Sequence, residues 1–276
     1  MTNHHLSLLA VFAHPDDEVG VAGSMKRYVK EGARVTLVCA TRGEVGEIAP
    51  GHPATPETLG QVREQELRTA MSMLDVTEIL FLDYRDSGMA GTPQNADPTN
   101  LHQAPLDEVT GRIVKIIRAT KPQVLVTFDP TGGYGHPDHL KVHAAVMAAF
   151  DAAGDAQRYP EAGEPFAPKK LYWTAFSRGL MEKIAPIMKA MGFDPKIGTT
   201  SVFELGMKDE DITTKINVGE WSDLKEKAWS AHATQHNPNS PFSKIPRPIM
   251  RRFMKTENFV LAKSRVAPRN GVEKDL

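Results

Sequence analysis

The stretch LLAVFAHPDDEVG, residues 8–20, runs from six apolar residues straight into a histidine and three acids. The apolar run predicts a buried strand over Leu6–Ala13, since a strand covered on both faces reads as continuous apolar sequence. The three acids have a simple explanation as caps of a following helix, because carboxylates stabilise a helix N-terminus. One acid would suffice for that purpose, so three acids beside His14 favour a functional site.

Outward from this stretch, short β-rich runs alternate with helical patterns through the first half of the chain. This alternation predicts βαβ units and a mostly parallel sheet flanked by helices, which is an α/β fold. In such sheets, ligands bind beyond the carboxyl ends of the strands, where the strand order reverses. Expected strands are 6–13, 33–40, 78–83 and 123–128, and expected helices are 21–33, 55–76, 106–121 and one that starts at Pro137.

The second half of the chain is less regular, and it contains no internal repeat and no linker long enough to separate two domains. We therefore expect a single domain over 1–276, with a core at 1–155, a smaller C-terminal α+β portion at 156–264 and a loose polar tail at 265–276. Expected strands of the C-terminal portion are 169–177, 212–219 and 257–264, and expected helices are 178–193 and 220–235.

The composition restricts the partners and the compartment. Lys and Arg together number 33 against 34 for Asp and Glu, so the chain has no broad basic field for nucleic acid. The first apolar run is too short to span a bilayer and lacks the basic flank of a signal peptide. The single cysteine, Cys39, excludes an internal disulfide and fits a reducing compartment. We expect a cytoplasmic protein that binds neither nucleic acid nor membrane, and homo-oligomerisation stays open.

The first motif, HPDDE, carries candidate metal ligands. His14 and Asp17 are three residues apart, so within one turn they can point the same way. Imidazole and carboxylate are ordinary ligands of a divalent ion such as zinc. Asp16 lies between them, and a free carboxylate beside a metal-bound water is well placed to act as a general base.

The second motif, GGYGHPDH at residues 132–139, places His136 and His139 three apart on the first turn of a helix. Zinc hydrolases use about three protein ligands and keep one position for water, so one of these histidines completes the set. The other then acts on the substrate, and Asp138 is placed to orient a histidine. His143 lies on the same helical face as His139, so the pair His139 and His143 stays a rival ligand set.

The chain lacks the signatures of several other enzyme classes. No GxGxxG follows the first strand, no GxSxG elbow occurs and no Walker loop is present. A dinucleotide-binding, serine-hydrolase or nucleotide-triphosphate function therefore has no motif in its favour.

AHPDDE and GGYGHPDH together resemble the PIG-L or LmbE-like superfamily of zinc-dependent N-acetylglucosamine deacetylases. The blocks TRGEVGEI, VREQELRTA, YRDSGMAGT and AHATQ resemble, in the same order over most of residues 6–235, the branch that holds the mycothiol-pathway deacetylase and mycothiol S-conjugate amidase. The chain departs from that branch at Val19–Val21, where a polar residue that touches the substrate is usual. The resemblance implies a Rossmann-like sheet with a smaller C-terminal portion.

The resemblance also implies a role for each motif residue. The metal ligands would be His14, Asp17 and His139, which excludes His143. The catalytic residues would be Asp16 as general base, His136 as acid and oxyanion partner, Asp138 tuning His136, and Tyr134 on the oxyanion.

Three further residues are candidates for substrate binding. Arg63 and Asp86 match residues that hold the sugar hydroxyls, with a surface ion pair and an Asx turn as the respective alternatives. His232, in AHATQ, either lines the mouth of the site or caps its helix.

The expected reaction is hydrolysis of the N-acetyl group of an N-acetylglucosamine-type sugar, with N-acetylglucosaminyl-inositol as one candidate substrate. The expected cofactor is Zn²⁺, with Fe²⁺ as an alternative in the cell, because a nitrogen and oxygen site discriminates weakly between the two. Two alternatives stay open: an amidase acting on thiol conjugates or another small amide, and a sugar-binding domain without catalysis.

Overall fold

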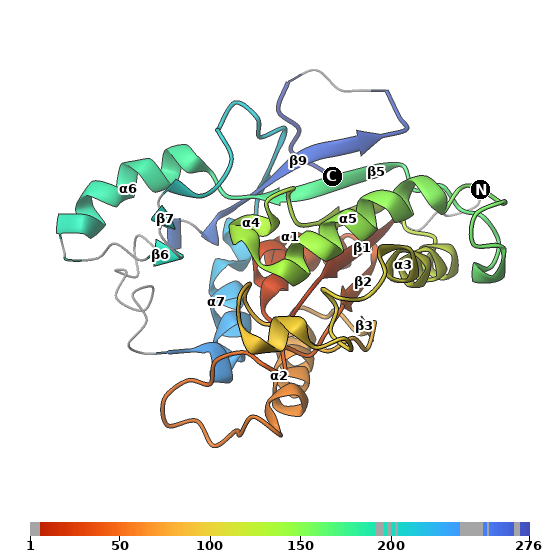
Figure 1. The fold of residues 1–276 in the computed structure, drawn as a ribbon. Helices are drawn as coiled ribbons and strands as arrows, with labels where there is room; N and C mark the ends of the chain where they lie inside the picture. The colour runs from red at the N-terminus through yellow and green to blue at the C-terminus, as the bar shows by residue number, and fades with distance from the viewer. Residues whose placement is uncertain are drawn as a thin grey trace.

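A seven-stranded sheet forms the centre of the protein in the computed structural model (Figure 1). Its strand order is β3-β2-β1-β4-β5-β9-β8. The first five strands in this order run parallel, and β9 and β8 pair antiparallel at one edge. The predicted α/β fold with a mostly parallel sheet is confirmed.

The structure describes residues 6–190, 192, 196–197, 200–201, 204–237, 251–252, 254–267 and 271–276. The strands are β1 Ser7–Phe12, β2 Arg34–Cys39, β3 Glu78–Phe81, β4 Val124–Thr127, β5 Lys170–Ala175, β6 Lys196–Ile197, β7 Thr200–Ser201, β8 Thr214–Asn217 and β9 Thr256–Ser264. The α-helices are α1 Ala22–Lys30, α2 Leu59–Met73, α3 Leu106–Thr120, α4 Gly132–Gly135, α5 Pro137–Ala152, α6 Arg178–Ala190 and α7 Ser222–Ser230. The short 3-10 helices are η1 Asp17–Val21, η2 Pro93–Ala96, η3 Pro160–Ala162, η5 Gly219–Trp221 and η6 Ala233–Gln235.

The strand order reverses beside β1. From β1 the chain builds outward through β2 and β3, and then returns to add β4 on the other side of β1. Ligands of open α/β sheets bind at such a reversal, beyond the carboxyl ends of the strands. HPDDE follows β1 and GGYGHPDH follows β4, so both motifs lie at this position.

Helices cover both faces of the sheet. α3 and α5 pack against each other on one face, and α1, α2 and α7 form a second layer (Figure 1). The layers explain the continuous apolar sequence of β1, in which Leu9, Val11 and Phe12 are fully buried. The C-terminal portion shares this core, since Ile216 and Phe259 belong to the same buried cluster.

The described part of the tail, 265–267 and 271–276, is mostly exposed but makes several hydrogen bonds to the rest of the chain. Arg265 donates to the carbonyl oxygens of Pro168 and Phe150 at 2.7 and 2.8 Å. Glu273 accepts from Lys170 Nζ at 2.8 Å, and its backbone pairs with β8 through Lys215 N at 2.9 Å. These partners lie far away in the sequence, which is why a polar tail gave no sign of them.

The expected helix over 220–235 is interrupted. It consists of η5, α7 and η6, and the break between α7 and η6 falls at Ala231 and His232. The break turns His232 toward the first motif, as described below.

Within the described residues, no helix combines the length and the apolar character needed to cross a membrane.

Candidate metal and catalytic centre

Three side chains of the two motifs converge on one point at the end of β1. His14 Nδ1 lies 3.2 Å from His139 Nε2 and 3.5 Å from Asp17 Oδ2, and Asp17 Oδ1 lies 3.3 Å from His139 Nε2. Ligand atoms about 2.0–2.1 Å from a tetrahedral zinc ion lie about 3.3–3.4 Å apart. The three separations therefore match the edges of a zinc coordination polyhedron.

In each histidine, the ring nitrogen that points away from the convergence point makes a hydrogen bond. These bonds determine which nitrogen carries the lone pair that faces the convergence point. His139 Nδ1 donates to the Gly132 carbonyl at 2.9 Å, and His14 Nε2 donates to Asp138 Oδ2 at 3.1 Å. In the neutral rings, His139 Nε2 and His14 Nδ1 then carry lone pairs that point at each other. Two facing lone pairs repel unless a proton or a metal ion lies between them, so the donor set fits a bound metal ion, which would take the place of a proton on His14.

The charges around the point agree with this assignment. Burial alone would lower the pKa of His14, but the carboxylates of Asp86, Asp138 and Asp17 outweigh it and raise that pKa well above its usual value. Burial would raise the pKa of Asp17, but the neighbouring histidines hold it well below its usual range. The carboxylates around this point therefore favour the binding of a positive ion there.

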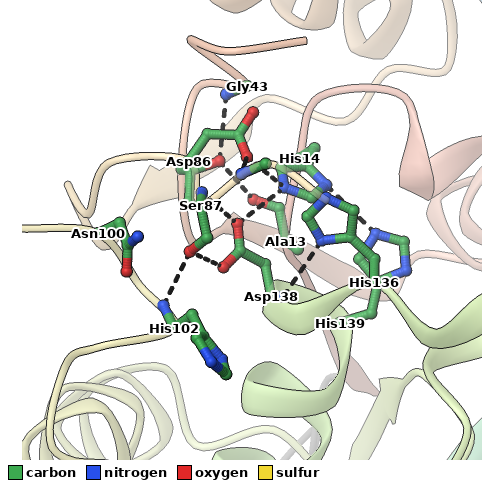
Figure 2. A network of polar contacts seen from close by, with 12 residues as sticks. Ala13, His14, Gly43, Asp86, Ser87, Asn100, His102, His136, Asp138 and His139 are labelled. Atoms are coloured by element: carbon green, nitrogen blue, oxygen red, sulfur yellow. Dashed lines mark hydrogen bonds and ion pairs between the residues drawn. The ribbon is translucent and has the colours of Figure 1, made fainter. Parts of the chain in front are cut away.

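His14 is oriented by carboxylates on the side away from Asp17. Asp138 Oδ2 and Asp86 Oδ1 lie 3.1 and 3.4 Å from His14 Nε2 (Figure 2). Asp138 is itself held by Ser87, whose backbone N–H donates at 3.0 Å and whose hydroxyl also donates. A carboxylate behind a ligating histidine fixes its tautomer and raises its basicity.

The direct hydrogen-bond partner of the Asp138 carboxylate among the motif histidines is His14, and tuning of His136 stays a prediction. The resemblance implied that its carboxylate tunes His136, but the carboxylate faces His14 and Ser87. The backbone N–H of Asp138 donates to His136 Nδ1 at 3.2 Å, and the charge of its carboxylate acts to raise the pKa of His136. His136 is the N-cap of α5 and Asp138 is the second residue of that helix, so the two side chains point in different directions.

Gly132 allows His139 to approach the loop that precedes α5. Its φ is +61°, and a Cβ at this position would meet His139 Cβ at 2.8 Å. The Phe128 ring stacks on the His139 ring at a centroid distance of 4.0 Å. Backbone and aromatic contacts thus hold His139 in place on two sides.

His143 points elsewhere. Its Nδ1 donates to the Phe128 carbonyl at 2.9 Å, and its ring lies 5.5 Å from that of Trp173. The grouping of histidine donors near His14 contains His136 and His139. The rival pair of His139 and His143 therefore does not form.

Asp16 lies between the metal-ligand candidates in a strained backbone conformation, with φ 111° and ψ −22°. Burial raises the pKa of Asp16 to about 6, although the Arg63 guanidinium, 3.3 Å from Oδ2, opposes this shift. A carboxyl group whose pKa lies near neutrality can both accept and return a proton. These properties suit a general base.

His136 and Tyr134 lie on the other side of the convergence point. The His136 ring packs edge-on against the His14 ring at a centroid distance of 4.7 Å (Figure 2). The centroid of the Tyr134 ring lies 5.0 Å from that of His139. Burial, with the charges of His14 and His139, lowers the pKa of His136 to about 4. Because its Nδ1 accepts a hydrogen bond, the neutral ring presents Nε2–H as a donor. Tyr134 is 40% exposed and marks the open side of the site.

The structure places the three expected substrate residues as follows. Arg63 is buried and donates to the carbonyl oxygens of Gly43 and Pro15, so its contact with a sugar stays a prediction. Asp86 forms the Asx turn that was its alternative, by accepting from Gly88 N at 2.9 Å, and also approaches His14. His232 has no exposed surface, so the expectation that it lines the mouth of the site is wrong.

Two supporting residues were missing from the prediction. Ser87 orders Asp138, and Asp129 accepts from Thr131 N at 2.7 Å and Gly133 N at 3.2 Å, which shapes the loop that carries Tyr134. The Asp-Pro-Thr-Gly sequence that follows β4 carried a turn signal that pointed to Asp129. No signal in the sequence paired Ser87 with Asp138.

Comparisons with known proteins agree with this site. The sequence profile of the PIG-L family, described as GlcNAc-PI de-N-acetylase, matches residues 9–150. The chain is 41% identical to 1D-myo-inositol 2-acetamido-2-deoxy-alpha-D-glucopyranoside deacetylase of Rhodococcus erythropolis, over 100% of this chain and 98% of the relative. It is 39% identical to the protein of the same name in Streptomyces scabiei, over 94% and 85% of the two chains.

Among solved structures, the fold is similar to N,N'-diacetylchitobiose deacetylase from Pyrococcus horikoshii. The TM-score is 0.66 at 20% identity, covering 92% of this chain and 83% of that one. This similarity concerns the fold, and the sequence relatives carry the family assignment. The chain belongs to the PIG-L family.

Proposed function

We propose that this chain is a zinc-dependent N-deacetylase that hydrolyses the acetamide of an N-acetylglucosamine-type sugar, with N-acetylglucosaminyl-inositol as substrate. The observation that carries the proposal is the convergence of His14 Nδ1, His139 Nε2 and the Asp17 carboxylate next to Asp16, whose carboxylate pairs with Arg63. The printed names of the relatives, which are deacetylases of an inositol-linked acetamido sugar, support the choice of substrate.

His14, Asp17 and His139 would hold the metal. When bound, a zinc ion supplies a Lewis acid that lowers the pKa of water and polarises the amide carbonyl. Fe²⁺ could supply the same chemistry in the cell, because the donor set contains only nitrogen and oxygen.

Asp16 takes the proton of the attacking water. Its pKa of about 6 keeps the carboxylate ionised at neutral pH, yet close enough to neutrality to release the proton again. His136, with a pKa of about 4, is neutral under the same conditions and suits a hydrogen-bond donor to the developing oxyanion. Protonation of the departing amine then falls to Asp16, which has just received a proton.

Tyr134 is the second candidate donor to the oxyanion. Although 40% of Tyr134 is exposed, partial removal of water from around its hydroxyl raises the pKa of that group, with the nearby Asp17 carboxylate adding to the shift, so the group keeps its proton. The glycines that flank it leave the ring free to meet a substrate, and Gly133 and Gly135 have φ of +72° and +87°.

Arg63 and Asp86 are proposed to bind the sugar hydroxyls. Both are buried at the floor of the site and touch the HPDDE loop or His14. Contact with a hydroxyl would add to these roles and would not replace them.

A substrate panel tests the proposal. Zinc-loaded protein should release acetate from N-acetylglucosaminyl-inositol faster than from free N-acetylglucosamine, and removal of the metal with a chelator should abolish the release. Cleavage of a thiol-conjugate amide in preference to both sugars would instead favour the amidase. Failure to cleave any of the three, with zinc bound, would overturn the proposal.

A further inference from the structure

A buried ion pair connects the first motif to the C-terminal portion. His232 Nε2 donates to Glu18 Oε1 at 2.8 Å, and neither side chain has exposed surface. The two residues are 214 positions apart in the sequence. His232 stands at the break between α7 and η6, and the break turns its ring inward.

The second oxygen of Glu18 holds the backbone of Asp16. Glu18 Oε2 accepts a hydrogen bond from Asp16 N at 2.8 Å. In a capping box, an acidic side chain binds the N-cap backbone N–H in the same way from three residues further along, whereas Glu18 is two residues along. Asp16 has φ 111°, a left-handed conformation that non-glycine residues rarely adopt. A strained residue persists only when its surroundings hold it.

The conformation of Asp16 decides where its carboxylate points. Asp16 and Asp17 are adjacent, yet one is assigned to the proton and the other to the metal, so their side chains must leave the backbone in different directions. Arg63 steadies the same loop by donating to the Pro15 carbonyl at 2.6 Å. A misplacement of about 1 Å in a catalytic group can reduce a rate by about 10²-fold.

His232 uses only one of its nitrogens. Nδ1 is buried and has no hydrogen-bond partner, whereas Nε2 is committed to Glu18. With no exposed surface, the ring has no access to a substrate. Its hydrogen bond to the first motif is the one to Glu18.

We propose that Glu18 and His232 are positioning residues that hold Asp16 in its left-handed conformation, so that the C-terminal portion completes the active site through one buried contact. The inference rests on the proposed role of Asp16 as general base. It assigns a role in catalysis to a residue of the first motif that sequence alone leaves as a helix cap.

Matched substitutions separate positioning from stability. Glu18→Ala removes both contacts, and Glu18→Gln keeps an acceptor for Asp16 N. His232→Gln keeps a donor near the Nε2 position, whereas His232→Asn places its amide near Nδ1. The control is Thr234→Val, because Thr234 Oγ1 donates to Glu66 Oε2 at 2.6 Å in the same buried region without touching Asp16.

The first readout is the rate of acetate release from N-acetylglucosaminyl-inositol by zinc-loaded protein. Glu18→Ala and His232→Asn should lower kcat by about 10- to 100-fold with KM and zinc content unchanged. Glu18→Gln, His232→Gln and Thr234→Val should stay within about threefold of the unsubstituted protein, whatever they do to the melting temperature. In an Asp16→Asn background, Glu18→Ala should have no further effect on kcat.

The second readout is independent of any substrate. Amide hydrogen exchange at Asp16, followed by NMR, should accelerate in Glu18→Ala and His232→Asn and stay slow in His232→Gln and Thr234→Val. If exchange follows this pattern but no protein releases acetate, the positioning pair stands and the proposed function fails. The inference is overturned if His232→Asn, which removes the donor to Glu18, keeps both slow exchange and full kcat. It is also overturned if Glu18→Ala lowers kcat by the same factor with and without Asp16.

Discussion

Replacing Asp138 by asparagine removes a buried negative charge behind His14 while keeping the shape of the side chain. The carboxylate accepts three hydrogen bonds, from Ser87 N, Ser87 Oγ and His14 Nε2. An amide offers one acceptor oxygen, so its NH₂ group must face either Ser87 Oγ or the N–H groups of Ser87 and His14. Loss of a carboxylate behind a ligating histidine typically weakens metal binding by about 10- to 100-fold. That factor corresponds to about 1.4–2.7 kcal/mol of zinc affinity.

The stability of the metal-free protein should also fall. Asp138 has no exposed surface, and a buried donor left without an acceptor costs about 1–3 kcal/mol. The assays are competition for zinc against a chromophoric chelator, and thermal unfolding with and without zinc. Ser87→Ala is the matched control, because it removes one bond to Asp138 and keeps the contact with His14, so its zinc affinity should change by less than about threefold.

The zinc Kd and kcat of Asp138→Asn distinguish two roles of the Asp138 carboxylate. If Asp138 supports His14, the zinc Kd rises in Asp138→Asn. If Asp138 instead tunes His136, as the resemblance implied, kcat falls while the zinc Kd stays within about twofold of the unsubstituted protein. That second outcome would refute the reasoning from the structure.

Three further predictions use the same preparation. Asp16→Asn should lower the rate of acetate release by about 10²–10⁴-fold with one equivalent of zinc still bound, and an unchanged rate would remove Asp16 from its role. Gly132→Ala should destabilise the protein by about 1–3 kcal/mol and weaken zinc binding, because its Cβ would meet His139 Cβ at 2.8 Å at a φ of +61°; calorimetry and zinc titration measure both effects. His143→Ala should leave zinc affinity and kcat unchanged, and a loss of zinc would restore His143 as a ligand.

The sequence predicted the sheet and the location of the site because both depend on local patterns. The apolar run before HPDDE has the continuous character of a strand buried on both faces, and β1 occupies Ser7–Phe12 as expected. The placement of both motifs at the reversal of strand order follows from the alternation of strands and helices. Pro137 begins α5 as its position in the motif predicted.

Local sequence patterns do not predict contacts between distant segments of the chain. Spacing alone left His139 and His143 equivalent, and the choice between them depends on the Gly132 and Phe128 carbonyls that each ring meets. The partner of Asp138 is set by Ser87, which lies 51 positions away.

His232 shows the same limit in another way. Its block, AHATQ, resembled part of the family site, so exposure to substrate was a reasonable expectation. The ring is instead buried and hydrogen-bonded to Glu18. Neither the HPDDE segment nor the AHATQ segment contains a pattern that predicts this contact. The contacts of the tail after Ser264 have the same character, since the partners of Arg265 and Glu273 lie in distant segments of the chain.

The position of the bound metal tests the central claim most directly. Crystals of the zinc-loaded protein, measured at the zinc absorption edge, should give one anomalous peak about 2.0–2.2 Å from His14 Nδ1, His139 Nε2 and the Asp17 carboxylate. Asp16 should lie beside the peak without binding it. A second group of donors, His14 Nε2 with Asp86 and Asp138, also lies close together. A peak among those atoms instead would contradict both the ligand assignment and the role given to Asp138.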